Sequence, residues 1–207
     1  ESAVGLIHVD LFTTVDGVAQ APGGPEEDLT EGFAFGGWQA PLIDEVVGDQ
    51  VVQSMSQMGA LLLGRRTYDL FAAYSPHQGG AIAERLNRIP KYLVSRTPRD
   101  LQWAGTQQLG THLGPAISEL RERHEHTHVI GSLNLVQTLL TEGWFDRLNL
   151  WTHPVLLGSG KRVFADGTVP TRLKLVEPAV TSPSGVVLQR YERLHGTPGV
   201  GDMSESD

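Results

Sequence analysis

Arginine and small polar residues follow three short apolar runs of the chain, at points where strands are expected to end. The segments are Gly64-Arg65-Arg66-Thr67 after Leu63, Ser95-Arg96-Thr97 after Val94, and Gly131-Ser132-Leu133-Asn134 after Ile130. Two of them open a predicted helix, whose free backbone N–H groups and positive dipole end favour anions. The pattern predicts a pocket for a compact, multiply charged anion, and a dinucleotide with an extra phosphate fits that description.

The same residues have a plainer explanation, because arginine after a strand is often solvated and Gly64 could form an ordinary turn. That explanation is the better one for any single segment, whereas agreement among all three favours an anion site. Neither the G-x-G-x-x-G fingerprint nor the P-loop pattern occurs in the sequence, which argues against an ordinary Rossmann or NTPase site.

The overall charge narrows the class of ligand. The chain has 207 residues with 24 acidic and 16 basic side chains, a formal net charge of −8. Neither nucleic acid nor an anionic membrane is therefore an expected partner. The absence of cysteine removes disulfides and thiolate metal sites and is compatible with the expected cytoplasmic location. No apolar run approaches the ~18 residues of a membrane span.

The elements that position these segments alternate between strand and helix. Strands are expected at 6–12, 60–63, 92–94 and 128–130, as one long strand at 148–157 interrupted by Pro154, and as an antiparallel pair at 173–176 and 186–191. Helices are expected over 42–57, 68–74, 80–88, 115–124 and 133–142. This order predicts one α/β domain over 1–194 with a mostly parallel sheet, followed by a disordered tail over 195–207. Ligands of such sheets bind outside the carboxyl ends of the strands.

A glycine-rich segment, residues 20–40, separates the first strand from the first helix. Long ordered loops are often functional, and this one carries Phe33, Phe35 and Trp38. We expect these rings to cover a substrate pocket, with Phe35 and Trp38 stacking on a planar substrate ring. Anchoring of the loop in the core would use the same aromatic residues equally well.

Several motifs are similar to those of a known superfamily. They are Val15-Asp16-Gly17-Val18, Gly64-Arg65-Arg66-Thr67-Tyr68, Tyr92-Leu93-Val94-Ser95, Ile130-Gly131-Ser132-Leu133-Asn134-Leu135 and the stretch from His153 to Phe164. Over about residues 4–193 the chain resembles the dihydrofolate-reductase-like superfamily, specifically stand-alone proteins similar to the C-terminal reductase domain of riboflavin biosynthesis. The resemblance implies a three-layer α/β/α fold, NADPH as cofactor and, usually, a homodimer.

The resemblance also implies roles for individual positions. Arg65, Arg66 and Thr67 would hold the NADPH phosphates, and Ser95 with Arg96 would meet the adenosine 2′-phosphate. The other implied cofactor positions are Gly64, then Gly131, Ser132, Leu133, Asn134 and Leu135 along the pyrophosphate, Asp16, Gly17 and Val18 near the nicotinamide, and Gly158, Ser159 and Gly160 beside it.

Two residues are candidates for a catalytic role. The acid of dihydrofolate reductase would fall near Asp44 or Glu45, although acids at a helix start also stabilise its dipole. His153 could place a proton on a C=N nitrogen, while a histidine packed at a strand kink is the plainer interpretation. The three histidines within 124–128 could form a metal site, but a solvated junction is favoured and no metal is expected.

These observations favour an NADPH-dependent reductase that transfers hydride to a small heterocycle, pteridine-like or aminopyrimidine-like. The alternatives are an NADP(H)-binding sensor or scaffold without turnover, and a structural dimer with a vestigial site. The riboflavin reductases tend to carry basic residues on the first helix for a ribose phosphate. Residues 42–57 contain no lysine or arginine, which disfavours a phosphorylated substrate.

Two further expectations concern assembly and coenzyme choice. Apolar side chains crowd the segment before Pro154 more than one sheet face needs, which predicts a twofold interface. These side chains are Trp144, Phe145, Leu148, Leu150 and Trp151. NADPH differs from NADH by one phosphate, and we expect Arg66 and Arg96 to select it, since no acid lies beside them to bind ribose hydroxyls.

Overall fold

Strand β1 (Leu6–Thr14) lies inside a nine-stranded sheet. The computed structural model describes residues 4–164 and 166–205. The other strands are β2 (Ala60–Gly64), β3 (Lys91–Val94), β4 (Thr106–Leu109), β5 (His126–Ile130), β6 (Arg147–His153), β7 (Arg172–Leu175), β8 (Val180–Thr181) and β9 (Val187–Leu194). Their order is β4-β3-β2-β5-β1-β6-β9-β7, with β8 also paired to β9. The strands from β4 to β6 in this order are parallel, and β7, β8 and β9 are antiparallel. The expected sheet is therefore confirmed.

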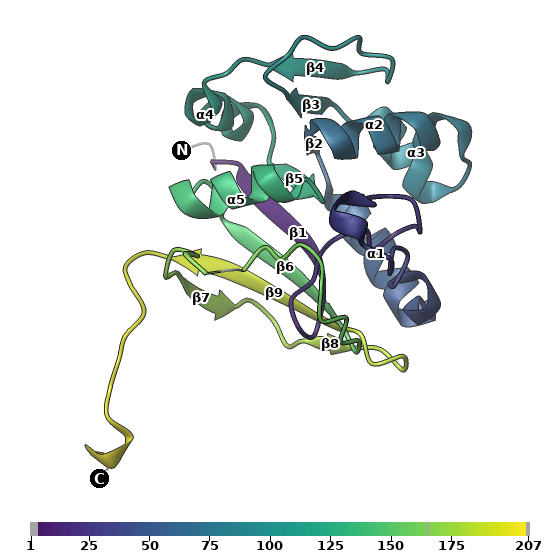
Figure 1. The fold of residues 1–207 in the computed structure, drawn as a ribbon. Coiled ribbons are helices and arrows are strands. Elements are labelled where there is room, and N and C mark those ends of the chain that lie inside the picture. The colour runs from purple at the N-terminus through teal and green to yellow at the C-terminus, as the bar shows by residue number, and fades with distance from the viewer. Residues whose placement is uncertain (1–3, 165, 206–207) are drawn as a thin grey trace.

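Helices cover both faces of the sheet and give the expected three layers (Figure 1). They are α1 (Glu45–Gln57), α2 (Arg65–Tyr74), α3 (Ala81–Arg88), α4 (Leu113–Arg123) and α5 (Leu133–Glu142), with short 3-10 turns at Thr30–Gly32, Ala40–Leu42, Ser75–His77 and Met203–Glu205. Helices α4 and α5 pack on one face, and α1, α2 and α3 pack on the other.

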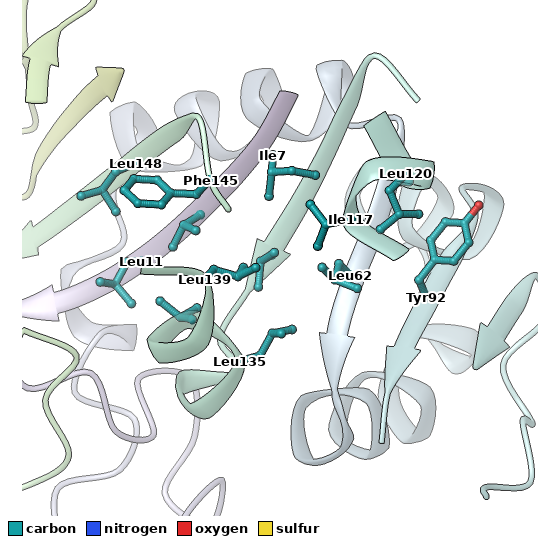
Figure 2. Packing of buried hydrophobic residues seen from close by; sticks show 14 of the residues in the cluster. Ile7, Leu11, Leu62, Tyr92, Ile117, Leu120, Leu135, Leu139, Phe145 and Leu148 are labelled. Carbon is teal, nitrogen blue, oxygen red and sulfur yellow. The ribbon is translucent and has the colours of Figure 1, made fainter. Parts of the chain in front are cut away.

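The larger core cluster lies between the sheet and helices α4 and α5 (Figure 2). Ile7 and Leu11 of β1 point into it together with Leu139 of α5, and all three are at most 1% exposed. Side chains alternate across a strand, so β1 presents its apolar residues to this cluster and polar His8 and Asp10 to the opposite face. Each buried aliphatic side chain contributes about 1.5–3 kcal/mol, so this cluster fixes the sheet under the predicted site.

Two expectations about the elements are wrong, and two short strands, β4 and β8, were not expected. Helix α2 begins at Arg65 rather than Tyr68, because extended Gly64 is its N-cap and Thr67 lies inside the first turn. Strand β6 ends at His153, because Pro154 cannot donate to a ladder and the chain turns there with Val155 N bonded to the His153 carbonyl at 2.7 Å. Strand β4 was not expected, since its sequence is mostly polar and it forms an edge of the sheet.

The apolar segment before Pro154 is mostly inside the monomer. Phe145, Leu148 and Trp151 are 2–3% exposed and belong to the core clusters. They therefore cannot supply the twofold interface that the sequence suggested. Exposed apolar side chains do occur on the edge strand β7, at Leu173 and Leu175, and in Val176 after it.

The C-terminal segment leaves the body of the molecule after β9 (Figure 1). Residues 195–204 are exposed, and residues 206–207 of the predicted tail lie outside the described residues. Disorder of this tail stays a prediction. No helix in the described part of the chain is long and apolar enough to cross a membrane.

Candidate functional site

The three strand ends that carry the predicted anion site are neighbours in the sheet. Strand β2 pairs with β3 on one side, where Gly64 lies opposite Val94, and with β5 on the other. The Gly64 amide donates to the Ser132 hydroxyl at 2.9 Å, and the Ser132 amide donates to the Thr67 hydroxyl at 2.9 Å. These bonds hold the start of α2 against the start of α5. The three predicted segments therefore lie side by side.

Both helices begin with their backbone N–H groups free of side-chain caps. Neither Gly64 before α2 nor Ser132 before α5 makes a side-chain cap hydrogen bond, so the first N–H groups remain available to an anion. Gly131 and Ser132 have φ of 60° and 55°. A non-glycine residue in this region costs energy, and such strain gathers at functional sites. Leu135 is buried in the core, which leaves only its backbone for a ligand.

In the part of the chain that the structure describes, Arg65 and Arg96 are the free cations at these strand ends. Both are exposed, and neither has a hydrogen-bond or ion-pair partner among the described residues. Arg66 differs, because it forms an ion pair with Asp28 at 3.0 Å. The expectation that Arg66 has little else to pair with is wrong, since the loop that supplies Asp28 folds back onto α2. The Ser95 hydroxyl serves its own turn by donating to the Thr97 carbonyl at 2.9 Å.

Asp16 joins the end of β1 to the glycine loop after β6. Its carboxylate accepts hydrogen bonds from the Thr14 hydroxyl at 2.5 Å and from the Gly158 amide at 2.7 Å. These bonds, led by that from Thr14, lower the pKa of Asp16 to about 2. Gly17 has a φ of 80°, and Val18 is fully buried. Asp16 therefore positions the loop 158–160 and stays ionised at neutral pH.

The glycine loop needs Gly160 for close packing. This residue has a φ of 120°, and a Cβ atom there would lie 2.6 Å from Val18 Cγ1 and 2.8 Å from the Phe33 ring. Gly158 has open space around its missing Cβ atom. The loop 158–160 therefore packs directly against the aromatic segment 20–40, next to the end of β1.

His153 is fully buried and neutral. Its Nδ1 lies 3.0 Å from the Thr13 carbonyl, to which it must donate, and Nε2 has no partner among the described residues. Burial lowers the pKa of His153. The tautomer leaves a lone pair rather than a proton on Nε2, so the predicted proton delivery by His153 has no support in the geometry. Trp38 packs edge-on against this ring at 5.1 Å.

Asp44 is the N-cap of α1. Its Oδ1 accepts from the Val47 amide and its Oδ2 from the Ser184 amide, both at 2.9 Å. The bond from Val47 lowers the pKa of Asp44 to about 2, with help from Ser184. A carboxylate that is ionised at neutral pH cannot act as the acid, so the structure gives Asp44 a structural role instead of the catalytic one that was expected.

The aromatic residues of the loop divide into two groups. Trp38 and Phe33 are 7% and 5% exposed and pack with Val18, and the Trp38 indole donates to the Gln20 carbonyl at 2.8 Å. These two anchor the loop. Phe35 is 48% exposed and remains free to contact a ligand. Stacking of Phe35 and Trp38 on a substrate stays a prediction.

Sequence reasoning missed the residues that close the loop onto the site. The Gln20 side chain donates to the carbonyls of Asp28 and Thr30, and it accepts from the Lys161 amide. The Asp28 carboxylate bonds Lys161 Nζ at 2.7 Å as well as Arg66. No local pattern could reveal these contacts, because the partners are far apart in sequence.

The histidines of 124–128 do not form a solvated junction. His128 is 3% exposed and bonds Asp10 at 2.5 Å, with the ring of His8 stacked on it at 4.2 Å. His126 contacts His8, whereas His124 bonds the Tyr92 hydroxyl. The contacts among Asp10, His8, His126 and His128 link β1 to β5 within the sheet. Two shallow hollows of about 200 Å³ each are lined in part by Arg193. Neither is lined by a residue of the predicted site.

The sheet order and the helices on both faces define an α/β protein with the dihydrofolate-reductase fold. The model of the RibD C-terminal domain family matches residues 6–188, and the chain belongs to that family. The uncharacterized protein YyaP of Bacillus subtilis (strain 168) is 26% identical over 187 residues, which are 87% of this chain and 91% of that protein.

Solved structures share the fold at low sequence identity. A pyrimidine reductase-like protein from Corynebacterium diphtheriae has a TM-score of 0.65 at 17% identity, with 93% of each chain covered. Dihydrofolate reductase from Enterococcus faecalis, complexed with NADP(H), has a TM-score of 0.56 at 14% identity and covers 91% of this chain and 96% of its own. Family and fold support an oxidoreductase.

Proposed function

We propose that this protein is an NADPH-dependent reductase that transfers hydride to a small heterocycle of pteridine or aminopyrimidine type, in chemistry related to riboflavin biosynthesis. The observation that carries the proposal is the pair of unpartnered arginines, Arg65 and Arg96, beside two helix starts without side-chain caps. In an acidic protein, free cations at the ends of adjacent parallel strands match a ligand with several phosphates.

The described residues fit NADPH in distinct ways. The first N–H groups of α5, from Leu133 onward, would bind the pyrophosphate, while Arg65 and Arg96 would hold the 2′-phosphate. Asp16 fixes the wall at Gly158 beside the nicotinamide end. The cofactor supplies the hydride, and the chain binds and orients both reactants and excludes water.

The proton of the reaction comes from water in this proposal. Asp16 and Asp44 each have a pKa of about 2, so neither holds a proton at neutral pH. His153 donates its Nδ1 proton to the Thr13 carbonyl. These side chains therefore shape the site and do not deliver protons.

Binding without turnover is the second candidate, and the lack of an acid among those three side chains favours it. The two candidates differ in one readout, because a reductase consumes NADPH with some oxidant and a sensor only binds it. Titration of the purified protein with NADPH and with NADH, followed by protein fluorescence, tests the shared cofactor assignment. Equal affinity for the two coenzymes would contradict it.

We also propose a cytoplasmic homodimer. The apolar edge of β7 supports the assembly, because Leu173, Leu175 and Val176 are exposed on a strand that has a free side. A second copy would cover these side chains and the strand edge together. Sedimentation at micromolar concentration tests the assembly, and a monomer there would argue against it.

A further inference from the structure

The segment that faces the substrate end of the proposed site is strongly acidic. With the phosphates at the ends of β3, β2 and β5, the substrate end falls at the ends of β1 and β6. The segment 15–57, which follows β1, contains eight acidic side chains and no lysine or arginine. The first lysine or arginine in the sequence is Arg65. An anionic substrate would therefore meet negative charge on this side.

Lys161 and Arg162, which follow β6, already have carboxylate partners, and Asp28 also joins Lys161 to Arg66 at the start of α2. Asp28 Oδ2 lies 3.0 Å from Arg66 Nη1 and 2.7 Å from Lys161 Nζ, and the Asp28 side chain is only 13% exposed. Arg162 bonds the Asp16 carbonyl at 2.9 Å and lies 3.6 Å from its carboxylate. Asp28 is held in place by bonds from the amide and hydroxyl of Thr30.

Exposed apolar side chains gather around this end. Val15 is 61% exposed and Leu156 is 73% exposed. The two lie close together, because the Val15 amide donates to the Val155 carbonyl at 3.1 Å. Phe35 packs edge-on against Phe33, which itself meets the glycine loop. Such a surface suits the faces of a flat, uncharged ring.

We propose that the substrate end takes a planar ring without phosphate, and that Asp28 determines this specificity by occupying Arg66 and Lys161. The inference rests on the proposed function and names its substrate class. A substrate phosphate would have to displace the Asp28 carboxylate from both cations, and nearby acids would oppose it. Replacing Asp28 with asparagine should free the two cations to bind a phosphate.

The test uses ribose 5-phosphate as probe, with ribose as the uncharged counterpart. Calorimetric titration is done with the protein saturated by NADP⁺, which occupies the other phosphate positions. Asp28→Asn should bind ribose 5-phosphate about tenfold or more tighter than the unmodified protein, because a freed charge-assisted bond is worth at least that factor. Glu27→Gln is the matched control, since Glu27 bonds the amides of Gly23 and Gly24 and no cation.

Two results would overturn the inference. One is tight binding of ribose 5-phosphate by the unmodified protein, and the other is no greater gain for Asp28→Asn than for Glu27→Gln. Adding Lys161→Gln to Asp28→Asn should remove the gain, and thermal unfolding confirms that the variants fold. If NADP⁺ itself fails to bind, the proposed function fails, while the comparison among variants still decides the role of Asp28.

Discussion

Removal of one free arginine should weaken NADPH binding much more than NADH binding. Arg96 is exposed and has no partner among the described residues. A charge-assisted hydrogen bond contributes about 1.5–3 kcal/mol, which corresponds to roughly 10- to 150-fold in affinity. Solvent and salt screen an exposed side chain, so we expect the lower end, about tenfold, for Arg96→Ala at physiological ionic strength. Arg65→Ala should behave similarly.

Arg66→Ala should cost less than either, because Arg66 is already paired with Asp28 at 3.0 Å. Arg88→Ala is the matched control, since Arg88 is also exposed and has no partner in the described chain. It precedes β3, so it lies at the amino ends of the parallel strands and not at their carboxyl ends. Each variant is titrated with both coenzymes by protein fluorescence. If Arg96→Ala and Arg65→Ala both bind NADPH as Arg88→Ala does, the reasoning is wrong.

Three further substitutions test packing and polar contacts in the fold. Gly160→Ala should lower Tm and NADPH affinity, because its Cβ would lie 2.6 Å from Val18 Cγ1. Gly158→Ala is the control and should affect packing less, since the space around its Cβ is open. Equal effects of the two substitutions would contradict the steric explanation. Lys91→Met should destabilise the fold by about 1–3 kcal/mol in urea unfolding. The buried Lys91 Nζ donates to three backbone carbonyls around the end of α3, and the substitution leaves them without this donor. An unchanged urea midpoint would refute this prediction. The pKa of Asp16 falls from its ordinary 3.8 to about 2, so the stabilisation it gives is present above pH 4 and is lost as pH falls through 2. Asp16→Asn should flatten that part of the stability curve, and an identical curve would argue against the contact with Gly158.

Local sequence patterns predicted most of the strands and helices of this protein. The apolar run ending in Gly64 predicted a buried strand, and Gly143 with a φ of 68° ends α5 as expected from its position. Strand ends with glycine, serine and arginine pointed to the edge where the sheet gathers β3, β2 and β5. These features depend on neighbours within one turn or one strand, so periodicity and turn chemistry encode them.

Tertiary packing decided what the polar side chains do. Asp44 looked like a possible acid, but its two oxygens are used by amides of Val47 and Ser184, the latter 140 residues away. Arg66 looked as free as Arg96, yet Asp28, 38 residues earlier, reaches it across the folded loop. Sequence alone therefore predicted a position for an anion, at strand ends that lie side by side in the sheet. Which cations stay free for it depends on long-range pairing, because a carboxylate finds its partner only after the chain has folded around it.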